Sequence, residues 1–270
     1  MKASLKSFGV LLLTITLTSC GGGGGGSSSG NSGSGSVTPP VSNASPGGIW
    51  SGRDPITGFP VLAVVAEDGR TQVVVDDGFP FTQYWGTLST GGNSITSSTF
   101  QVADTSVYYG TATVSGTVAA RSSLSLNVSF TPAAGCPAST CGTARSASGT
   151  LSFDSLYNRG GALSRVVGNW RDLSTTQVWN INSSGVVFQQ DAATGCVING
   201  QISTINTQYN AYAATYTFQS CRIPYTQLNG TTATGLVVVD DVRVPNRIYL
   251  GAQYRSGGVA YTVYGVADKT

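Results

Sequence analysis

Histidine is absent from this chain of 270 residues, and glutamate occurs once, as Glu67. Without histidine, the serine–histidine and cysteine–histidine pairs that activate a nucleophile cannot form, so these classes of catalytic site are excluded. Charged residues of all kinds make up only 10% of the chain. We therefore expect neither a basic surface for nucleic acid nor a charged funnel for an ionic substrate.

Long segments with apolar residues every three or four positions, which would predict amphipathic helices, are also lacking. Short runs of Val, Thr, Tyr, Ile and Phe recur instead, and Gly, Asn, Asp and Ser separate them. Short apolar runs with turn residues between them predict an all-β protein.

The first residues have the layout of an export signal. Lys2 and Lys6 precede an apolar run over residues 8–17, which is too short to span a bilayer comfortably. Small residues then lead to a cysteine, in the sequence Leu17-Thr18-Ser19-Cys20. These four residues resemble the lipobox of bacterial lipoproteins.

The lipobox resemblance implies that a signal peptide, residues 1–19, is cleaved and that Cys20 is acylated, for example with palmitate. The lipid bilayer would then be a partner through Cys20. Because Gly21 rather than Asp follows the cysteine, the resemblance implies an outer-membrane lipoprotein that faces the periplasm or the cell surface. The alternatives are an ordinary secretory signal with an unrelated cysteine, and an uncleaved anchor helix.

Residues 20–46 have the composition of a flexible linker. An unbroken glycine run at 21–26 is followed by only Ser, Gly and Asn up to residue 36, and prolines follow. Such a chain has little to bury and a large entropy cost of ordering, so it favours a loose tether.

A duplicated pattern divides the remainder at about residue 160. Gly48-Ile49-Trp50 recurs 120 residues later as Gly168-Asn169-Trp170, and similar runs and turns follow each tryptophan. We therefore predict two domains, residues 47–160 and 161–270, each a small antiparallel β-barrel of about eight strands. The pattern is similar in outline to calycins and to the glycine-tethered barrel lipoproteins of Gram-negative surfaces. Two β-sandwiches are the alternative.

Four cysteines remain after Cys20, an even number that predicts disulfides in an exported chain. Cys136 and Cys141 flank a short loop and can close a small ring. Cys196 and Cys221 lie equidistant from a predicted turn near residue 208, so they should face each other on paired strands. Because the two have different strand parity, their bridge needs a bulge or a place beyond the ladder. A metal site is the alternative use, but no metal or other cofactor is predicted.

Two further groups of residues have the chemistry for a site. Asp76-Asp77 and Asp240-Asp241 could bind calcium or act as acid and base, although adjacent residues at a strand end more often form a turn. Tyrosines gather after residue 208. Tyr212, Tyr216 and Phe218 share one face of a predicted strand, so they and Trp179 either fill a barrel or contact a ligand or partner.

These observations favour a non-enzymatic lipoprotein that acts as a binding or structural module at the cell envelope, with an unidentified protein or envelope partner. No catalytic residue is predicted. A carrier of a small apolar or aromatic ligand in the second barrel is the alternative, and a hydrolase based on the aspartates is a third.

Overall fold

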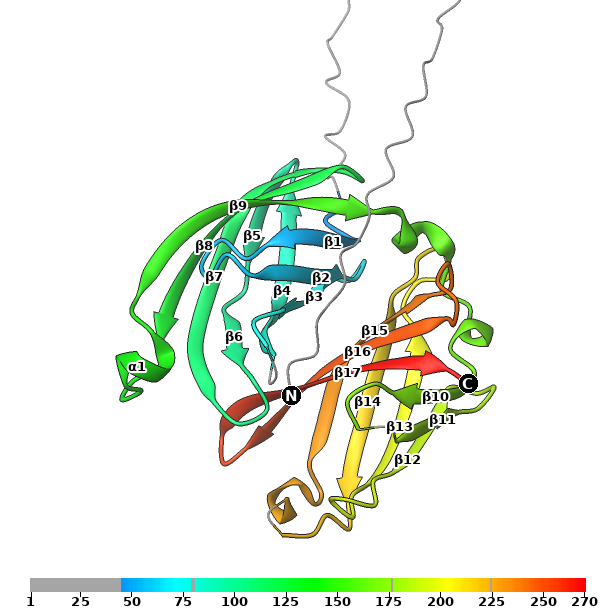
Figure 1. Cartoon of the computed structure of the whole chain (residues 1–270). Coiled ribbons are helices and arrows are strands. Elements are labelled where there is room, and N and C mark those ends of the chain that lie inside the picture. The colour runs from blue at the N-terminus through cyan, green and yellow to red at the C-terminus, as the bar shows by residue number, and fades with distance from the viewer. Residues whose placement is uncertain (1–44, 79–80, 176, 224) are drawn as a thin grey trace, which may run out of the picture. The chain divides into compact units, whose positions relative to one another are not determined.

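The computed structural model describes residues 45–78, 81–175, 177–223 and 225–270, and these fold into two closed antiparallel β-barrels (Figure 1). The prediction of two tandem barrels is therefore confirmed, and the sandwich alternative is not. In this described part of the chain, helix is limited to short turns: α1 (Ala138–Cys141) and the 3-10 turns η1 (Ser155–Arg159), η2 (Leu163–Arg165) and η3 (Thr226–Leu228). Within the described ranges, no helix is long and apolar enough to cross a membrane.

The first barrel contains nine strands, which fill eight strand positions around the barrel wall. Strands β5 and β6 follow each other between β4 and β7 and together occupy one place, and pairing of β3 with β4 completes the closure. The strands are β1 (Gly48–Arg53), β2 (Pro60–Val65), β3 (Arg70–Val75), β4 (Thr82–Gly91), β5 (Ser94–Ser97), β6 (Phe100–Ala103), β7 (Tyr108–Ala119), β8 (Ser123–Pro132) and β9 (Arg145–Asp154).

The second barrel runs up and down in chain order, and β17 pairs with β10 to close it. Its strands are β10 (Gly168–Asp172), β11 (Val178–Ile181), β12 (Val186–Gln190), β13 (Val197–Thr204), β14 (Tyr212–Gln219), β15 (Thr232–Asp240), β16 (Arg247–Ser256) and β17 (Val259–Lys269). Closing each sheet leaves no long unpaired strand edge, which would otherwise recruit other chains.

The duplication extends to individual hydrogen bonds. The indole N–H of Trp50 donates to the carbonyl of Pro46 at 3.0 Å, and that of Trp170 donates to Val166 at 2.7 Å, four residues upstream in both cases. Both tryptophans are fully buried in their barrels. The first strand of each barrel is therefore fixed in the same way.

An apolar seam joins the outer faces of the two barrels. Leu62 and Val64 of β2 share a cluster with Leu236 and Val238 of β15. At the centre, the side chain of Gln72 lies on the backbone of Gly251, where a Cβ atom would come within 1.1 Å of Gln72 Nε2. Because only glycine permits this approach, the two surfaces fit each other closely.

Polar contacts reinforce this seam. Asn210 is fully buried, and its amide donates to the carbonyls of Leu156, between the barrels, and of Val239 in β15. At another point, Thr262 of the second barrel donates its backbone N–H to Asp104 O and its hydroxyl to Ala103 O in the first. The two barrels therefore pack against each other as one unit rather than as two independent domains.

Candidate functional site

The predicted lipidation site, Cys20, lies outside the described residues, as do the signal peptide and most of the linker. The description begins with Ser45, whose hydroxyl donates to Glu67 at 3.0 Å. The other carboxylate oxygen of Glu67 accepts from the Tyr157 hydroxyl at 3.1 Å. The only glutamate of the chain thus ties Ser45 to the segment between the barrels.

Both predicted disulfides are present. Cys136 and Cys141 close a small ring around α1, and their Cα atoms lie 6.0 Å apart. The Cα atoms of Cys196 and Cys221 lie 3.9 Å apart.

The bridge between Cys196 and Cys221 lies just beyond the regular β13–β14 ladder, as expected from the different strand parity of the two cysteines. The last pair of the β13–β14 ladder is Val197 with Gln219, so Cys196 would face Ser220. Ser220 instead has a left-handed backbone (φ 57°), which brings Cys221 opposite Cys196.

The four aromatic residues for which the sequence leaves two roles open, packing or contact with a ligand or partner, lie in the core of the second barrel. Tyr212, Tyr216, Phe218 and Trp179 belong to one buried cluster, and none is more than 7% exposed. The Tyr212 hydroxyl donates to Ala162 O at 3.1 Å. The structure therefore uses these rings as packing, which is the first of the two roles that the sequence left open.

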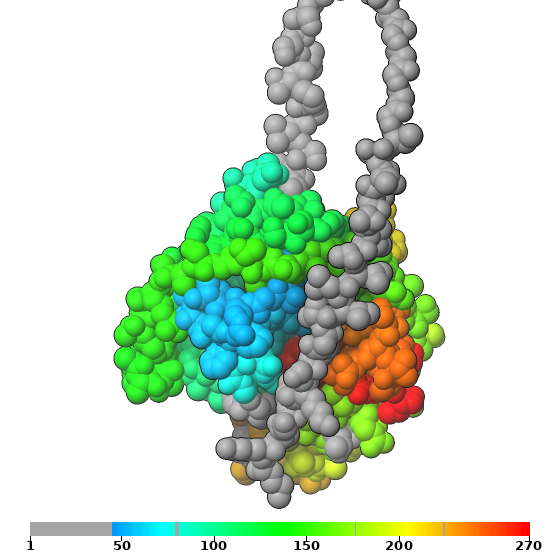
Figure 2. Space-filling model, turned by 45° about the horizontal axis from the view of Figure 1, so that its top comes forward, coloured from blue at the N-terminus to red at the C-terminus, as the bar shows by residue number. Residues whose placement is uncertain are grey.

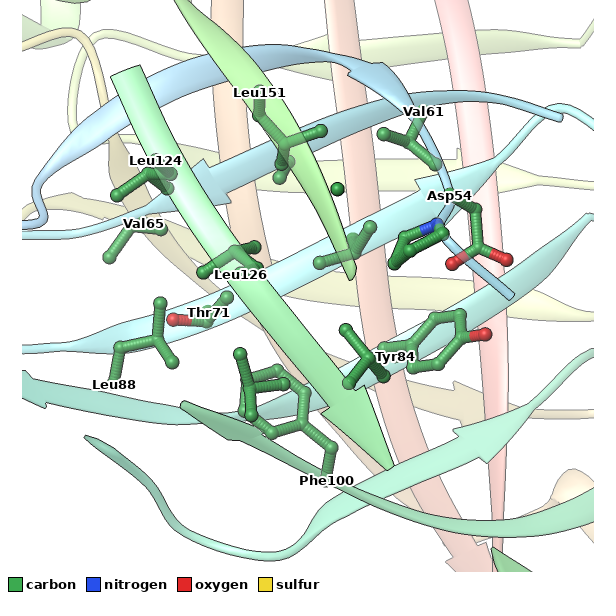
Figure 3. Close-up of a pocket in the computed structure, with 16 residues that line it drawn as sticks. Asp54, Val61, Val65, Thr71, Tyr84, Leu88, Phe100, Leu124, Leu126 and Leu151 are labelled. Atoms are coloured by element: carbon green, nitrogen blue, oxygen red, sulfur yellow. The ribbon is translucent and has the colours of Figure 1, made fainter. Parts of the chain in front are cut away.

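A cavity of about 50 Å³ lies instead inside the first barrel (Figure 3). Its wall is almost entirely aliphatic, with Val61, Leu124 and Leu151 on different strands around it. An engineered cavity of about 150 Å³ is known to hold benzene, so this space suits only a few heavy atoms. The sequence signal that could have located it is Gly149, which removes a side chain from the inward face of β9.

Two polar side chains, Asp54 and Tyr84, lie together at one end of this cavity (Figure 3). Asp54 is buried and accepts hydrogen bonds from the backbone N–H and the hydroxyl of Thr57, at 2.8 and 2.6 Å. Burial raises the pKa of Tyr84 well above its usual value, and the Asp54 carboxylate raises it further. Tyr84 is therefore a neutral hydroxyl at physiological pH and can orient a small ligand but not act as a base.

The aspartate pairs are used in turns and ion pairs. Asp77 accepts from the backbone N–H and the hydroxyl of Thr82, and Asp240 accepts from two backbone N–H groups that follow it. Asp241 forms salt bridges with Arg159 and Arg165, at 2.6 and 2.8 Å. Among the described residues, no three His, Cys, Asp or Glu side chains are grouped to hold a metal ion.

The outer face of β7–β9, whose residues are green in Figure 2, carries a regular array of small polar side chains that sequence reasoning missed. Three rows cross the three strands in register, and all nine side chains are exposed. Neighbours bond to each other, for example Ser148 to Asn127 at 2.6 Å. We call it the hydroxyl face: Thr113, Ser115, Thr117, Ser125, Asn127, Ser129, Ser146, Ser148 and Thr150. In the sequence, alternation of Ser and Thr with apolar residues indicates this face on each strand. The sequence does not show that the three strands pair in a register that places these side chains in rows.

The hydroxyl face carries no charge and no large apolar group. Exposed strands commonly carry lysine or glutamate, which repel other strands. An array of hydroxyl groups instead remains hydrated and forms hydrogen bonds with uncharged partners.

Comparison of the chain with protein-family models, with curated proteins and with solved structures finds no match.

Proposed function

We propose that this protein is a bacterial outer-membrane lipoprotein, anchored through acylated Cys20, whose paired barrels form a non-enzymatic binding or structural module at the cell envelope. The observation that carries the proposal is the order of three segments. A lipobox-like Leu17-Thr18-Ser19-Cys20 is followed at once by a Gly/Ser run and then by a folded β-body. A lipid at one end of a loose tether keeps such a body near a membrane without fixing its orientation.

The surface of the body supports a binding or structural role. Without residues 1–19 the chain has 12 Lys and Arg, which is 14 minus Lys2 and Lys6, against 12 Asp and Glu. The net charge is then zero, and the hydroxyl face offers hydrogen bonds without charge. Such a surface suits an uncharged protein or envelope polymer better than an ionic one.

The anchor is tested by expressing the full chain and its Cys20→Ala variant in a Gram-negative host, with Ser29→Ala in the linker as a matched control. We expect the wild type and Ser29→Ala to incorporate labelled palmitate and to enter the detergent phase on Triton X-114 partition. Cys20→Ala should do neither. Equal partition of all three proteins into the aqueous phase would refute the anchor.

The side of the membrane is tested by treating intact cells with protease. Loss of the protein from unbroken cells means that the barrels face outward, and the partner is then sought outside the cell. Protection until the outer membrane is permeabilised means that they face the periplasm.

A second candidate function, carriage of a small apolar ligand, is favoured by the cavity of the first barrel. The sequence placed this ligand in the second barrel, but the residues named there are packed together, so the candidate moves to the space beside Asp54 and Tyr84. In the wild type, xenon, a single atom that suits a space of this size, should shift the NMR signals of the Val61 and Leu124 methyl groups. In Ala63→Leu, whose added carbons fill the space, it should not. Unshifted methyl signals in the wild type would exclude the carrier.

A further inference from the structure

A crevice of about 160 Å³ lies between the barrels, at an edge of the apolar seam. The first barrel contributes Arg70, Trp85 and the segment around Thr87, and the second contributes Thr234 and Gln253. It is larger than the 50 Å³ cavity inside the first barrel. Sites between domains are common places for small ligands.

Trp85 lines this crevice and carries an unused hydrogen-bond donor. Its side chain is only 5% exposed, and its indole N–H has no hydrogen-bond partner among the described residues. The buried indoles of Trp50 and Trp170 both donate to carbonyls. A buried N–H without a partner costs about 1–3 kcal/mol, so a native protein rarely leaves one unused without a reason.

Outside ion pairs, three other buried groups, Trp179 Nε1, the Tyr216 hydroxyl and Arg243 Nε, also lack hydrogen-bond partners among the described residues. Trp179 and Tyr216 lie within the packed core of the second barrel and Arg243 does not line the crevice, whereas Trp85 borders open space. Only Trp85 therefore combines an unused donor with room for a ligand beside its side chain.

The chemistry of the crevice selects an uncharged ligand. Arg70 is its only charged side chain, and Asp68 neutralises this guanidinium through a salt bridge of 2.7 Å. The remaining polar groups are the hydroxyls of Thr87, Ser98 and Thr234 and the amide of Gln253. Hydroxyls, an amide and an indole N–H match a molecule that carries several hydroxyl and ether oxygens.

We infer that this crevice binds one neutral sugar ring, with the Trp85 indole N–H donating to a ring or hydroxyl oxygen and Gln253 bonding from the other barrel. The volume is close to that of the engineered cavity of about 150 Å³ that holds benzene, so the six-membered ring of the sugar fits while its substituents extend toward the open side of the crevice. The inference does not depend on the lipid anchor, because every residue involved belongs to the barrels.

The test uses saturation-transfer NMR on the full-length protein with glucose, galactose and N-acetylglucosamine as probes. We expect at least one sugar to receive saturation from the wild type. Trp85→Phe, which removes the N–H and keeps a ring, should weaken its binding about tenfold, the loss of one hydrogen bond of about 1.4 kcal/mol. Gln253→Ala should weaken it similarly.

Gln201→Ala is the matched control, because Gln201 is an exposed amide of the same barrel that does not line the crevice, and it should bind as the wild type does. Gln253→Ala also serves if Trp85→Phe fails to fold, since Gln253 is only partly buried. No transfer to any of the three sugars, or equal transfer in both variants, would overturn the inference. So would a crystal grown with the sugar that shows only a water bonded to Trp85 Nε1.

Discussion

At the scale of single residues, the barrels depend on tyrosines that are buried in their neutral form. Burial raises the pKa of the Tyr212 hydroxyl to about 12, and Arg165 nearby only partly opposes this. Burial raises the pKa of Tyr216 in the same direction. Ionisation of either group inside the core would leave a charge without water, so the folded state holds them protonated.

This arrangement predicts the response to alkali. Because the folded pKa of Tyr212 lies above the unfolded value of 10.0, its contribution to stability is complete below pH 10 and is lost as the pH rises from 10 to about 12. The free energy of unfolding should therefore be lower at about pH 11, inside this window, than at about pH 8, below it. Tyr212→Phe should show a smaller fall. Urea denaturation at both pH values measures this, with tyrosinate absorbance as a second signal. An equal fall in both proteins would contradict the role of Tyr212.

At the scale of elements, much of each barrel was predictable because local turn chemistry decides it. The hairpin turns at 67–70 and 182–185 follow from Asp-Gly and Ser-Gly pairs. The division of residues 94–103 into two strands, β5 and β6, was not predictable. It accompanies a change of register against β7 that only the assembled sheet produces, since Thr96 of β5 pairs with Ser115 whereas Phe100 of β6 pairs with Ala112.

Replacing the turn glycine of either barrel, Gly69 or Gly185, should cause a similar loss of stability. Gly69 (φ 83°) and Gly185 (φ 80°) are left-handed, and an added Cβ would lie 2.4 Å from Leu88 O and 2.2 Å from Ile202 O. Gly69→Ala and Gly185→Ala should each lower the free energy of unfolding by about 2–4 kcal/mol, from strain and displaced backbone. Gly58→Ala is the control: its φ is 78° but an added Cβ meets nothing within 4 Å, so only the strain of about 1–2 kcal/mol applies. Chemical denaturation of the three variants measures this, and similar losses in all three would refute the close approach.

At the scale of the whole folded unit, the seam was the feature that the sequence reading missed. A signal was present, because residues 73–75 and 236–239 are unbroken apolar runs in strands that otherwise alternate. Such runs indicate strands that are buried on both faces. The crevice was missed for a related reason: Trp85 and Gln253 line one space only because the barrels pack together.

The seam is tested by enlarging Gly251. Gly251→Val would force its side chain into Gln72 and should separate the barrels, with a loss of about 1–3 kcal/mol or more. A single unfolding transition should become two, and Trp85 fluorescence should shift to longer wavelength as water reaches it. Gly91→Val is the matched control, because nothing lies within 4 Å of a Cβ added there. One unchanged transition in Gly251→Val would show that the seam does not couple the barrels.

The proposed function requires that a lipid on residue 20 holds the two barrels to a membrane. The most direct measurement is the intact mass of the protein purified from Gram-negative membranes. We predict the mass of residues 20–270 with both disulfides formed and with fatty acyl groups added, all of the added mass lying on the N-terminal peptide that contains Cys20. A mass that includes residues 1–19, or one without any acyl group, would contradict the account.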